Sequence, residues 1–512
     1  MLRPVRNTVR LLTIARVLAR HDALFLLDTL PFTRRIAVVA QRLSNRRAVG
    51  RPGERLARAL IELGPSFIKF GQALSTRADL VGDAIAADLS MLQDRIAPFP
   101  FADVERIITE ELDGPISEFF AEFDPVPIAA ASVAQVHRAV TKAGRTVAVK
   151  VSRPGVEAAF ERDVELLYWL ADTANRSQPG LRRLRLRESV TAFADTVAME
   201  LDLRFEAAAA SELDENFADD DTFRVPDVLW PLTAKRVLTT AWVEGMPIDE
   251  RDALAAAGFP PQIIAERAAR AFFKMVFTDG FFHGDMHPGN LFVGAKGEII
   301  AVDFGIMGRV DKATRRYLGE MLLAFLNGDY RRVAEIHFEA GYVPADRSVD
   351  MFAQASRSIA EPILGLPASD VSVARLLAQL FKVTETFGME VQPQLLVLQK
   401  TMLTAEGIGR GLCPEVNFWE LARPLIEEWM IQNVSAPAKL RRGLEDALDA
   451  AQRLPEIIRR ADRITRQISE DGVKLHPETV RAMLERRRGS IVQTWAPWAL
   501  ILILFAVLVA RH

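Results

Sequence analysis

Short apolar runs bounded by glycine mark the strands that this chain is expected to form. Two of them, at 291–293 and 299–302, are separated by Gly-Ala-Lys-Gly, and this pattern predicts a β-hairpin. A hairpin would bring Asn290 and Asp303, which flank the two runs, to the same end. A further segment at 236–245 predicts a strand that leads into a glycine turn.

Helical spacing of apolar residues prevails in much of the remaining chain. Pro65 suits the first turn of a helix on which Lys69 and Gln72 would share one side. On such a helix alone, a lysine would be expected to face solvent. In the C-terminal half, the segments at 315–325 and 352–365 have the apolar spacing of packed helices.

The polar residues around the predicted hairpin follow the order of a protein-kinase active site. The sequence His-Gly-Asp-Met-His-Pro-Gly-Asn at 283–290 precedes Asp-Phe-Gly at 303–305, as H-R-D-x-x-x-x-N precedes D-F-G in kinases. Asn290 and Asp303 would supply the hard oxygen ligands that Mg²⁺ prefers, and Asp285 would orient or deprotonate an attacking hydroxyl or water. A helix-capping aspartate before an ordinary strand pair is the alternative, but it does not explain three matching positions.

A lysine-bearing strand and an alanine-rich turn lie upstream, as in a kinase N-lobe. Val-Ala-Val-Lys at 147–150 matches the V-A-I-K strand, whose lysine binds the ATP phosphates and pairs with a helix glutamate. Because alanine keeps a Cβ, it restricts φ and the approach of backbone amides to phosphate, so the nucleotide is expected to bind differently from a glycine-rich loop. The turn residues expected at the nucleotide are Ala129, Ala130, Ala131 and Ser132.

Two glutamates on one predicted helical stretch are candidate partners for Lys150. Glu200 and Glu206 are separated by six positions and therefore lie on different helix faces, so they cannot both address the same point. Either could instead be a solvated surface acid. The strand that begins at 236 lies where a kinase has its hinge, which binds adenine through backbone groups.

Length and composition limit the remaining possibilities. The 512 residues suffice for two lobes and appendages, and the net charge of -3 gives no nucleic-acid signature, so no nucleic acid is expected as a partner. Cys413 is the single cysteine, which excludes an intramolecular disulfide and a cysteine-based zinc site. We expect it to be a buried structural thiol.

Both ends of the chain suggest contact with a membrane. The segment at 1–54 is rich in arginine and poor in acids, which favours an amphipathic helix on a membrane or another domain over a serine-rich transit peptide. The segment at 490–510 is largely apolar, has Trp495 and Trp498 near its start and follows three arginines. This pattern predicts a C-terminal membrane anchor with the large N-terminal part in the cytoplasm. Pro497 could instead divide it into an interfacial piece and a short helix. The basic segment at 431–489 would suit anionic headgroups or a solvated face.

Together these motifs resemble the UbiB family of atypical kinases, also called ABC-one or aarF-domain-containing kinases, over about residues 55 to 345. In that family a lysine-x-glycine-glutamine motif lies on an N-terminal extension that folds over the active site, and an alanine-rich loop replaces the glycine-rich loop. The residues to which the resemblance assigns site roles are Lys69, Gln72, Lys150, Glu200, Asp202, Glu206, Asp285, Asn290 and Asp303.

The resemblance also implies specific pairings and a function. Glu200 and Asp202 are expected to meet Lys69, and Glu206 is expected to pair with Lys150. ATP and Mg²⁺ are the implied cofactors of an ATPase or small-molecule kinase that supports ubiquinone biosynthesis at the inner membrane, with protein kinase activity disfavoured. Membrane lipids, lipid-like quinone precursors and soluble biosynthetic enzymes are the implied partners. Bacterial members often have two C-terminal spans, whereas one is convincing here.

Two other functions remain open. A phosphotransferase of the aminoglycoside or choline type has a similar His-Gly-Asp loop but would not explain the Lys69 segment or the anchor. A non-catalytic nucleotide-binding scaffold is the second alternative. We expect an α+β, two-lobed, protein-kinase-like fold, which divides into a basic segment (1–54), a helical extension (55–124), an N-lobe (125–245), a C-lobe (246–430), a basic helical tail (431–489) and a transmembrane segment (490–510).

Overall fold

The computed structural model describes residues 3–24, 50–75, 81–90, 97–177, 186–364, 386–389, 393–414 and 418–433. The chain separates into two compact units, at 1–431 and 432–512. The predicted anchor at 490–510 and nearly all of the predicted basic tail lie outside the described residues. Among the helices that are described, none is both long and apolar enough to cross a membrane.

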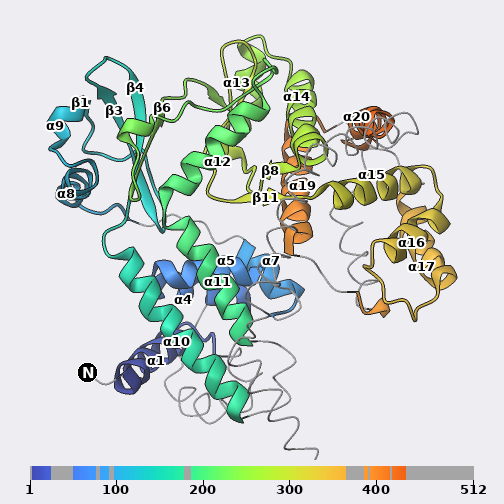
Figure 1. Ribbon diagram of the computed structural model, residues 1–512, viewed down its shortest axis with the longest axis horizontal. Coiled ribbons are helices and arrows are strands. Elements are labelled where there is room, and N and C mark those ends of the chain that lie inside the picture. The colour runs from blue at the N-terminus through green and yellow to red at the C-terminus, as the bar shows by residue number, and fades with distance from the viewer. Residues whose placement is uncertain are drawn as a thin grey trace, which may run out of the picture. The chain divides into compact units, whose positions relative to one another are not determined.

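The N-lobe is built on a five-stranded antiparallel sheet (Figure 1). Residues alternate along its central strand β4, so Val147, Val149 and Val151 are fully buried against helix α8 while Lys150 faces the other side. The sheet has the order β1-β3-β4-β6, with β2 paired to β3. Its elements are α8 (Phe101–Leu112), α9 (Ile116–Phe119), β1 (Phe120–Phe123), β2 (Ala129–Ala130), β3 (Ala134–Thr141), β4 (Thr146–Ser152) and β6 (Val237–Ala241).

This lobe begins earlier in the chain than the predicted boundary at residue 125. Strand β1 pairs with β3, with Phe120 opposite Thr141, and Phe120 shares a buried core with Phe99. Apolar residues from 99 onward therefore complete the sheet and its covering helix. They do not belong to a separate extension.

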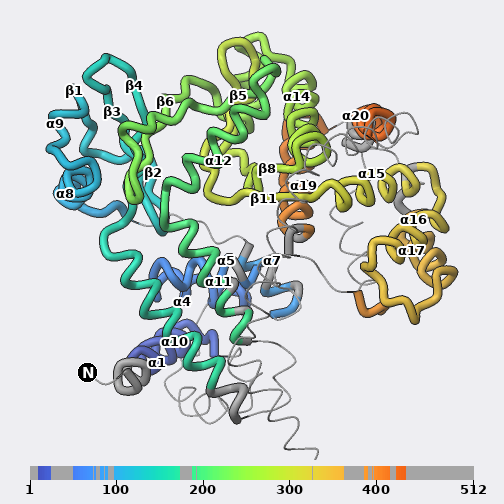
Figure 2. Tube along the Cα trace, viewed as in Figure 1, coloured from blue at the N-terminus to red at the C-terminus, as the bar shows by residue number. Residues whose placement is uncertain are grey.

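Three helices connect β4 to the rest of the lobe: α10 (Val156–Ser177), α11 (Leu186–Glu200) and α12 (Leu203–Asn216). The prediction of one helical stretch carrying both Glu200 and Glu206 was wrong, because the helix ends at Glu200 and a new one starts at Leu203. Asp202 lies between them, where its carboxylate accepts a hydrogen bond from the Arg204 backbone N–H at 3.1 Å. Aspartate favours such N-cap positions, and the break turns the trace (Figure 2).

The N-terminal extension consists of α1 (Arg3–Arg20), α4 (Pro52–Leu63), α5 (Pro65–Ser75) and α7 (Asp83–Ser90). Leu18 of α1 and Leu60 of α4 lie in one buried cluster. The Arg10 side chain reaches α10 and donates to Asp163 at 2.9 Å. The amphipathic helix expected in the first 54 residues is therefore formed, and its contacts are with other parts of this chain.

The C-lobe holds a four-stranded sheet of order β5-β10-β9-β7 and a two-stranded pair, β8 with β11. The predicted hairpin is confirmed, since β9 and β10 pair antiparallel with Leu291 opposite Ala301. Cys413 directly follows α19 and is half-buried, so the expectation of a buried thiol was wrong. The strands are β5 (Phe223–Arg224), β7 (Met246–Pro247), β8 (Phe281–His283), β9 (Leu291–Val293), β10 (Ile299–Ala301) and β11 (Met307–Arg309).

Helices make up the rest of the C-lobe, as the apolar spacing predicted. They are α13 (Arg251–Ala256), α14 (Pro261–Phe273), a π-helical turn (Lys274–Asp279), α15 (Lys312–Leu326), α16 (Tyr330–Glu339), α17 (Val349–Leu364), α19 (Pro393–Leu412) and α20 (Phe418–Asn433), with 3-10 turns at Trp230–Leu232 and Pro288–Asn290. Helix α19 lies beside α14 and β11 (Figure 1).

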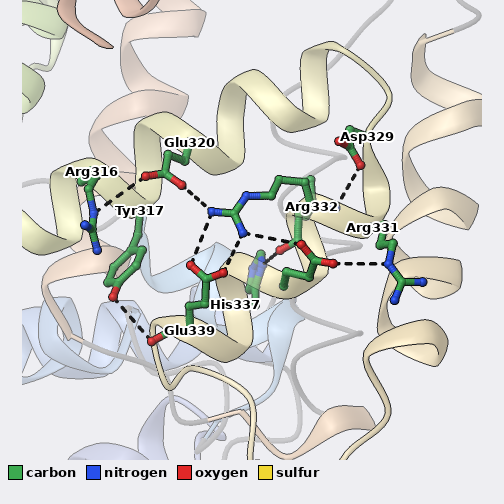
Figure 3. Close-up of polar contacts among 10 residues, drawn as sticks. Arg316, Tyr317, Glu320, Asp329, Arg331, Arg332, His337 and Glu339 are labelled. Atoms are coloured by element: carbon green, nitrogen blue, oxygen red, sulfur yellow. Dashed lines mark hydrogen bonds and ion pairs between the residues drawn. The ribbon is translucent and has the colours of Figure 1, made fainter. Parts of the chain in front are cut away.

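An ion-pair network joins α15 to α16 (Figure 3). The Arg332 guanidinium donates to Glu320 of α15 at 2.8 Å and to Glu339 of its own helix at 2.6 Å. Hydrogen bonds to Glu339, and further ones to Glu320, raise the pKa of Arg332 against the effect of burial. This arginine therefore links α15 to α16.

Candidate functional site

The hairpin brings the two predicted metal ligands to one end of the C-lobe sheet. The backbone N–H of Val302 donates to the carbonyl of Asn290 at 2.9 Å, which continues the ladder one step past the strands. Asp303 follows directly, with its backbone in the left-handed region at a φ of 64°. An aspartate in this conformation is uncommon and concentrates at functional sites, where the surrounding structure holds it.

Lys150 bridges the two lobes at this point. Its Nζ lies 2.8 and 2.9 Å from the two carboxylate oxygens of Glu206 on α12 and 3.0 Å from Oδ1 of Asp303. Burial by itself would lower the pKa of Lys150, but the charges of Asp303 and Glu206 outweigh it and raise that pKa above the ordinary value. The lysine is therefore an ammonium ion shared by two carboxylates.

The pKa values of the two carboxylates are shifted in opposite directions. The charge of Lys150, together with its hydrogen bond, lowers the pKa of Asp303 below its usual range. Burial raises the pKa of Glu206, and the nearby charge of Lys150 only partly offsets it. Asp303 is thus the firmly ionised oxygen donor of the pair, as a metal ligand must be.

The helical extension reaches the same cluster through Lys69. This lysine on α5 forms an ion pair with Glu200 at the end of α11, and its side chain is only 10% exposed. The charge of Lys69 also contributes to the lowered pKa of Asp303. A lysine that would be solvated on an isolated helix is therefore buried beside the site by the tertiary fold.

Asp202 and Gln72, the other two residues expected near Lys69, have contacts elsewhere. Asp202, expected to meet it together with Glu200, caps α12, and its carboxylate lies 2.6 Å from Arg204 Nη2. Side-chain hydrogen bonds from Arg204 lower the pKa of Asp202. Gln72 lies on α5 one turn beyond Lys69, where its backbone carbonyl accepts from the Ser75 hydroxyl at 2.7 Å.

The catalytic loop is held by hydrogen bonds of its own residues. Nδ1 of His283 accepts from the Asp285 backbone N–H at 3.1 Å, so its other nitrogen carries the proton and faces the carbonyl of Val302 at 3.2 Å. Burial lowers the pKa of His283 and favours this neutral form. The Asn290 amide nitrogen donates to the Asp285 carbonyl at 3.1 Å. The backbone of Asp285 is thus fixed on both sides.

The donor set at Asn290 and Asp303 fits a magnesium ion. Because the amide nitrogen of Asn290 donates to Asp285, its oxygen is directed elsewhere and can serve as a ligand. Carboxylate and amide oxygens are hard donors of the kind that Mg²⁺ takes along with substrate phosphates. Groups of three or more His, Cys, Asp or Glu side chains placed to hold a metal do not occur among the described residues.

The alanine-rich turn is held by an arginine that sequence reasoning did not identify. The side chain of Arg153 donates to the carbonyls of Ala131 and Ala97, each at 3.1 Å. Ala129 and Ala130 form strand β2, and Ser132 is fully buried in the following turn. The hydroxyl of Ser132 has no hydrogen-bond partner within the described part of the chain.

Residues 242–245 connect the two sheets. They follow β6 of the N-lobe sheet and precede β7 of the C-lobe sheet, and the Trp242 N–H donates to the carbonyl of Thr146 at 3.1 Å. This is the position that the strand and glycine turn predicted for a hinge. It places a backbone segment between the lobes beside β4.

A lysine missed by the sequence analysis lies at the catalytic loop. Nζ of Lys400, on α19, is 2.9 Å from Oδ1 of Asp285. A faint signal was present, since Lys400 is the sole charged residue between 393 and 405 in an otherwise apolar and amide-rich helix. Nothing in that pattern indicated which element the lysine would face.

The two lobes, the lysine strand and the catalytic loop define an atypical kinase. Comparison with known domains agrees, because residues 91–337 match the ABC1 atypical kinase-like domain and residues 356–417 match the UbiB helical domain. The second match extends the resemblance beyond residue 345. This chain belongs to the UbiB family.

Bacterial relatives match most of the chain. The probable protein kinase UbiB of Marinobacter nauticus is 41% identical over 464 residues, which span 88% of this chain and 85% of that protein. That of Azotobacter vinelandii is 42% identical over 462 residues, 88% of this chain and 86% of the relative. A solved Rv3197–erythromycin complex from Mycobacterium tuberculosis has a TM-score of 0.50 at 24% identity over 77% of this chain and 98% of that one, which supports the fold alone.

Proposed function

We propose that this protein binds Mg-ATP between its lobes and transfers the terminal phosphoryl group to water or a small molecule, in support of ubiquinone biosynthesis. The observation that carries the proposal is the contact of Lys150 with both Glu206 and Asp303. This contact presents a cation for phosphates beside a firmly ionised metal ligand. Asn290 and Asp303 would hold a magnesium ion, which would supply positive charge against the negative charge that develops on the phosphate.

A peptide acceptor is disfavoured by the helical extension. Lys69 on α5 is buried against Glu200, and its charge reaches Asp303, so the extension stands beside the phosphate-binding cluster. Asp285 would orient a compact nucleophile, because its backbone is held by His283 and Asn290. Water and small hydroxyl compounds are the acceptors that this arrangement favours.

The membrane is the proposed place of action. The name UbiB links the relatives to ubiquinone biosynthesis, whose intermediates are lipid-like. The apolar segment at 490–510 would anchor the catalytic lobes at the cytoplasmic face of the inner membrane. ATP turnover would then give soluble biosynthetic enzymes access to quinone precursors held in the bilayer.

The test is phosphate release from Mg-ATP by the purified full-length protein. Release is measured with and without anionic liposomes and a phenol that resembles a quinone precursor. Asp303→Asn is expected to lower release about a hundredfold or more, because the amide removes the ionised metal ligand. Asp346→Asn, in an exposed C-lobe loop, is the matched control and should retain activity.

The outcomes separate three functions. Lipid-stimulated release that Asp303→Asn abolishes supports the proposal. Phosphate found on the phenol would indicate a small-molecule phosphotransferase. Magnesium-dependent nucleotide binding without release above the variant would contradict the ATPase proposal and favour a non-catalytic scaffold.

A further inference from the structure

The catalytic loop contains no lysine or arginine between Asp285 and Asn290. The intervening sequence is Met-His-Pro-Gly, in which His287 Nδ1 accepts a hydrogen bond from the Gly289 N–H at 3.0 Å. Transfer of a phosphoryl group spreads negative charge over its oxygens, and enzymes place a cation where that charge develops. A cation at Asp285 must therefore come from another element.

Helix α19 supplies such a cation. Lys400 Nζ lies 2.9 Å from Asp285 Oδ1, across a sequence separation of 115 residues. Within the described part of the chain no donor contacts the second carboxylate oxygen of Asp285. One oxygen is thus held by the lysine, and the other is left to face an acceptor.

The position of Lys400 is set by the residues around it on α19. Leu398 and Thr401 are buried, and the Thr401 hydroxyl donates to the carbonyl of Val397 at 2.9 Å. A Cβ added at Gly284 would lie 3.0 Å from Cγ1 of Val397. The helix therefore packs closely on the residue that precedes Asp285, and a larger residue there would require Val397 to shift.

Each lysine at the site pairs with a different acid and comes from a different part of the chain. Lys69 of the extension pairs with Glu200, and Lys150 of the N-lobe pairs with Glu206 and Asp303. Lys400 pairs with Asp285 from within the segment that matches the UbiB helical domain. The charge at Asp285 is therefore supplied separately from the cluster that would hold the nucleotide.

We infer that Lys400 is a positioning residue for Asp285, so that the helical domain completes the active site of the kinase-like domain. This inference rests on the proposed function for its chemical step. Lys400 orients the carboxylate toward the nucleophile and adds positive charge beside the transferred phosphoryl group. Displacement of α19 would remove both effects without disturbing Lys150 or Asp303.

The kinetic test compares Lys400→Met, Lys400→Arg and the control Lys312→Met in the full-length protein. Lys312 is an exposed lysine at the start of α15, so its removal takes away the same charge elsewhere in the lobe. Lys400→Met should lower kcat about tenfold or more, while KM for ATP changes less than about twofold. Lys400→Arg should recover most of kcat, because a guanidinium can also hold a carboxylate.

An unchanged kcat in Lys400→Met, an effect confined to KM, or a failure of Lys400→Arg to recover activity would overturn the inference. A purely structural role would lower thermal stability and affect kcat and KM alike. The side chain is 45% exposed, so methionine should be accommodated without loss of folding.

A second measurement does not depend on turnover. A carbodiimide should join Lys400 to Asp285 by a zero-length amide cross-link, identified by mass spectrometry and absent from Lys400→Met. Turnover without this cross-link would overturn the inference and leave the ATPase proposal intact. The cross-link without turnover in the native protein would overturn the ATPase proposal and support the contact between α19 and the catalytic loop.

Discussion

Lys150 donates to both carboxylate oxygens of Glu206, at 2.8 and 2.9 Å, although 56 residues separate the two in sequence. The same ammonium reaches Asp303 on the other lobe at 3.0 Å. One buried cation thus holds a helix of the N-lobe and a metal ligand of the C-lobe. The stability and the chemistry of the site therefore depend on the same contact.

Removing one member of this buried pair should be more harmful than removing both. Glu206→Leu leaves Asp303 as the only one of the two carboxylates that balances the charge of Lys150. Lys150→Met leaves the Glu206 carboxylate buried without its counter-charge. We expect each single change to cost about 3–5 kcal/mol in the free energy of unfolding. The double variant should therefore lose less than either single variant, as measured by denaturant unfolding of all four proteins.

Strict additivity of the two changes would contradict this coupling. The exposed pair of Lys235 and Glu157 provides a control cycle, since its charges lie at the surface. We expect a coupling of at most about 1 kcal/mol there.

The ion pair between Lys69 and Glu200 should hold the extension over the site. Glu200→Gln removes the charge that opposes Lys69, so α5 should open more often. Hydrogen exchange of the amides at 65–75 should become faster in this variant. Glu157→Gln should leave that exchange unchanged, and equal rates in both variants would show that the ion pair does not hold α5.

The network at Arg332 should stabilise the packing of α15 on α16 (Figure 3). Arg332→Met removes hydrogen bonds to Glu320 and Glu339 and leaves two acids close together. We expect a loss of about 1–2 kcal/mol, seen as a lower Tm. Arg331→Met is the control, because its contacts with Glu335 and Asp350 are at the surface and should contribute less than about 0.5 kcal/mol.

Buried histidines should make the protein less stable in mild acid. Burial lowers the pKa of His337 and of His137 in the folded chain. Below pH of about 6.5 the unfolded chain therefore binds more protons than the folded chain. The contribution of these histidines to the free energy of unfolding is complete above that pH and is lost as the pH falls toward their pKa in the folded chain. Each histidine should cost up to about 1.4 kcal/mol at pH of about 5.5.

His337→Gln should reduce that loss. The neutral His337 donates from Nδ1 to the carbonyl of Val333 at 2.7 Å, and a glutamine amide can offer a similar donor. Unfolding free energies of the native protein and the variant are compared at several pH values. The difference in unfolding free energy between the two proteins should be constant above neutral pH and should become smaller below pH of about 6.5. If the difference stays the same at every pH, His337 does not contribute to the loss of stability in acid.

Much of the local structure followed from short-range patterns. The hairpin that joins Asn290 to Asp303 was predictable because apolar strands and a glycine-containing turn are encoded within a dozen residues. The β4 lysine was predictable for the same reason, since alternation along the strand separates Lys150 from the buried valines. By contrast, the helix break at Asp202 was missed because capping competes with helix continuation over only two residues.

The partners of three lysines could not be predicted from short-range patterns alone. For Lys150, helical spacing alone left Glu200 and Glu206 open as partners, and only the family resemblance assigned Glu206. The choice came from the break after α11, which directs one acid to Lys69 and the other to Lys150. For Lys400, the sequence offered only an isolated charge, because its partner Asp285 is brought near by the packing of α19 on the C-lobe.

The amino-acid order thus carries the residue types of the site, their strands and turns, and the resemblance to UbiB proteins, because these depend on neighbours along the chain. Packing of distant helices decides which lysine meets which acid, since a contact such as Lys400 with Asp285 depends on backbone approach at Gly284 and on burial around Thr401. Coulomb interactions act over a few ångströms in space, whatever the separation in sequence. The charges of the site therefore acquire their partners only in the folded protein.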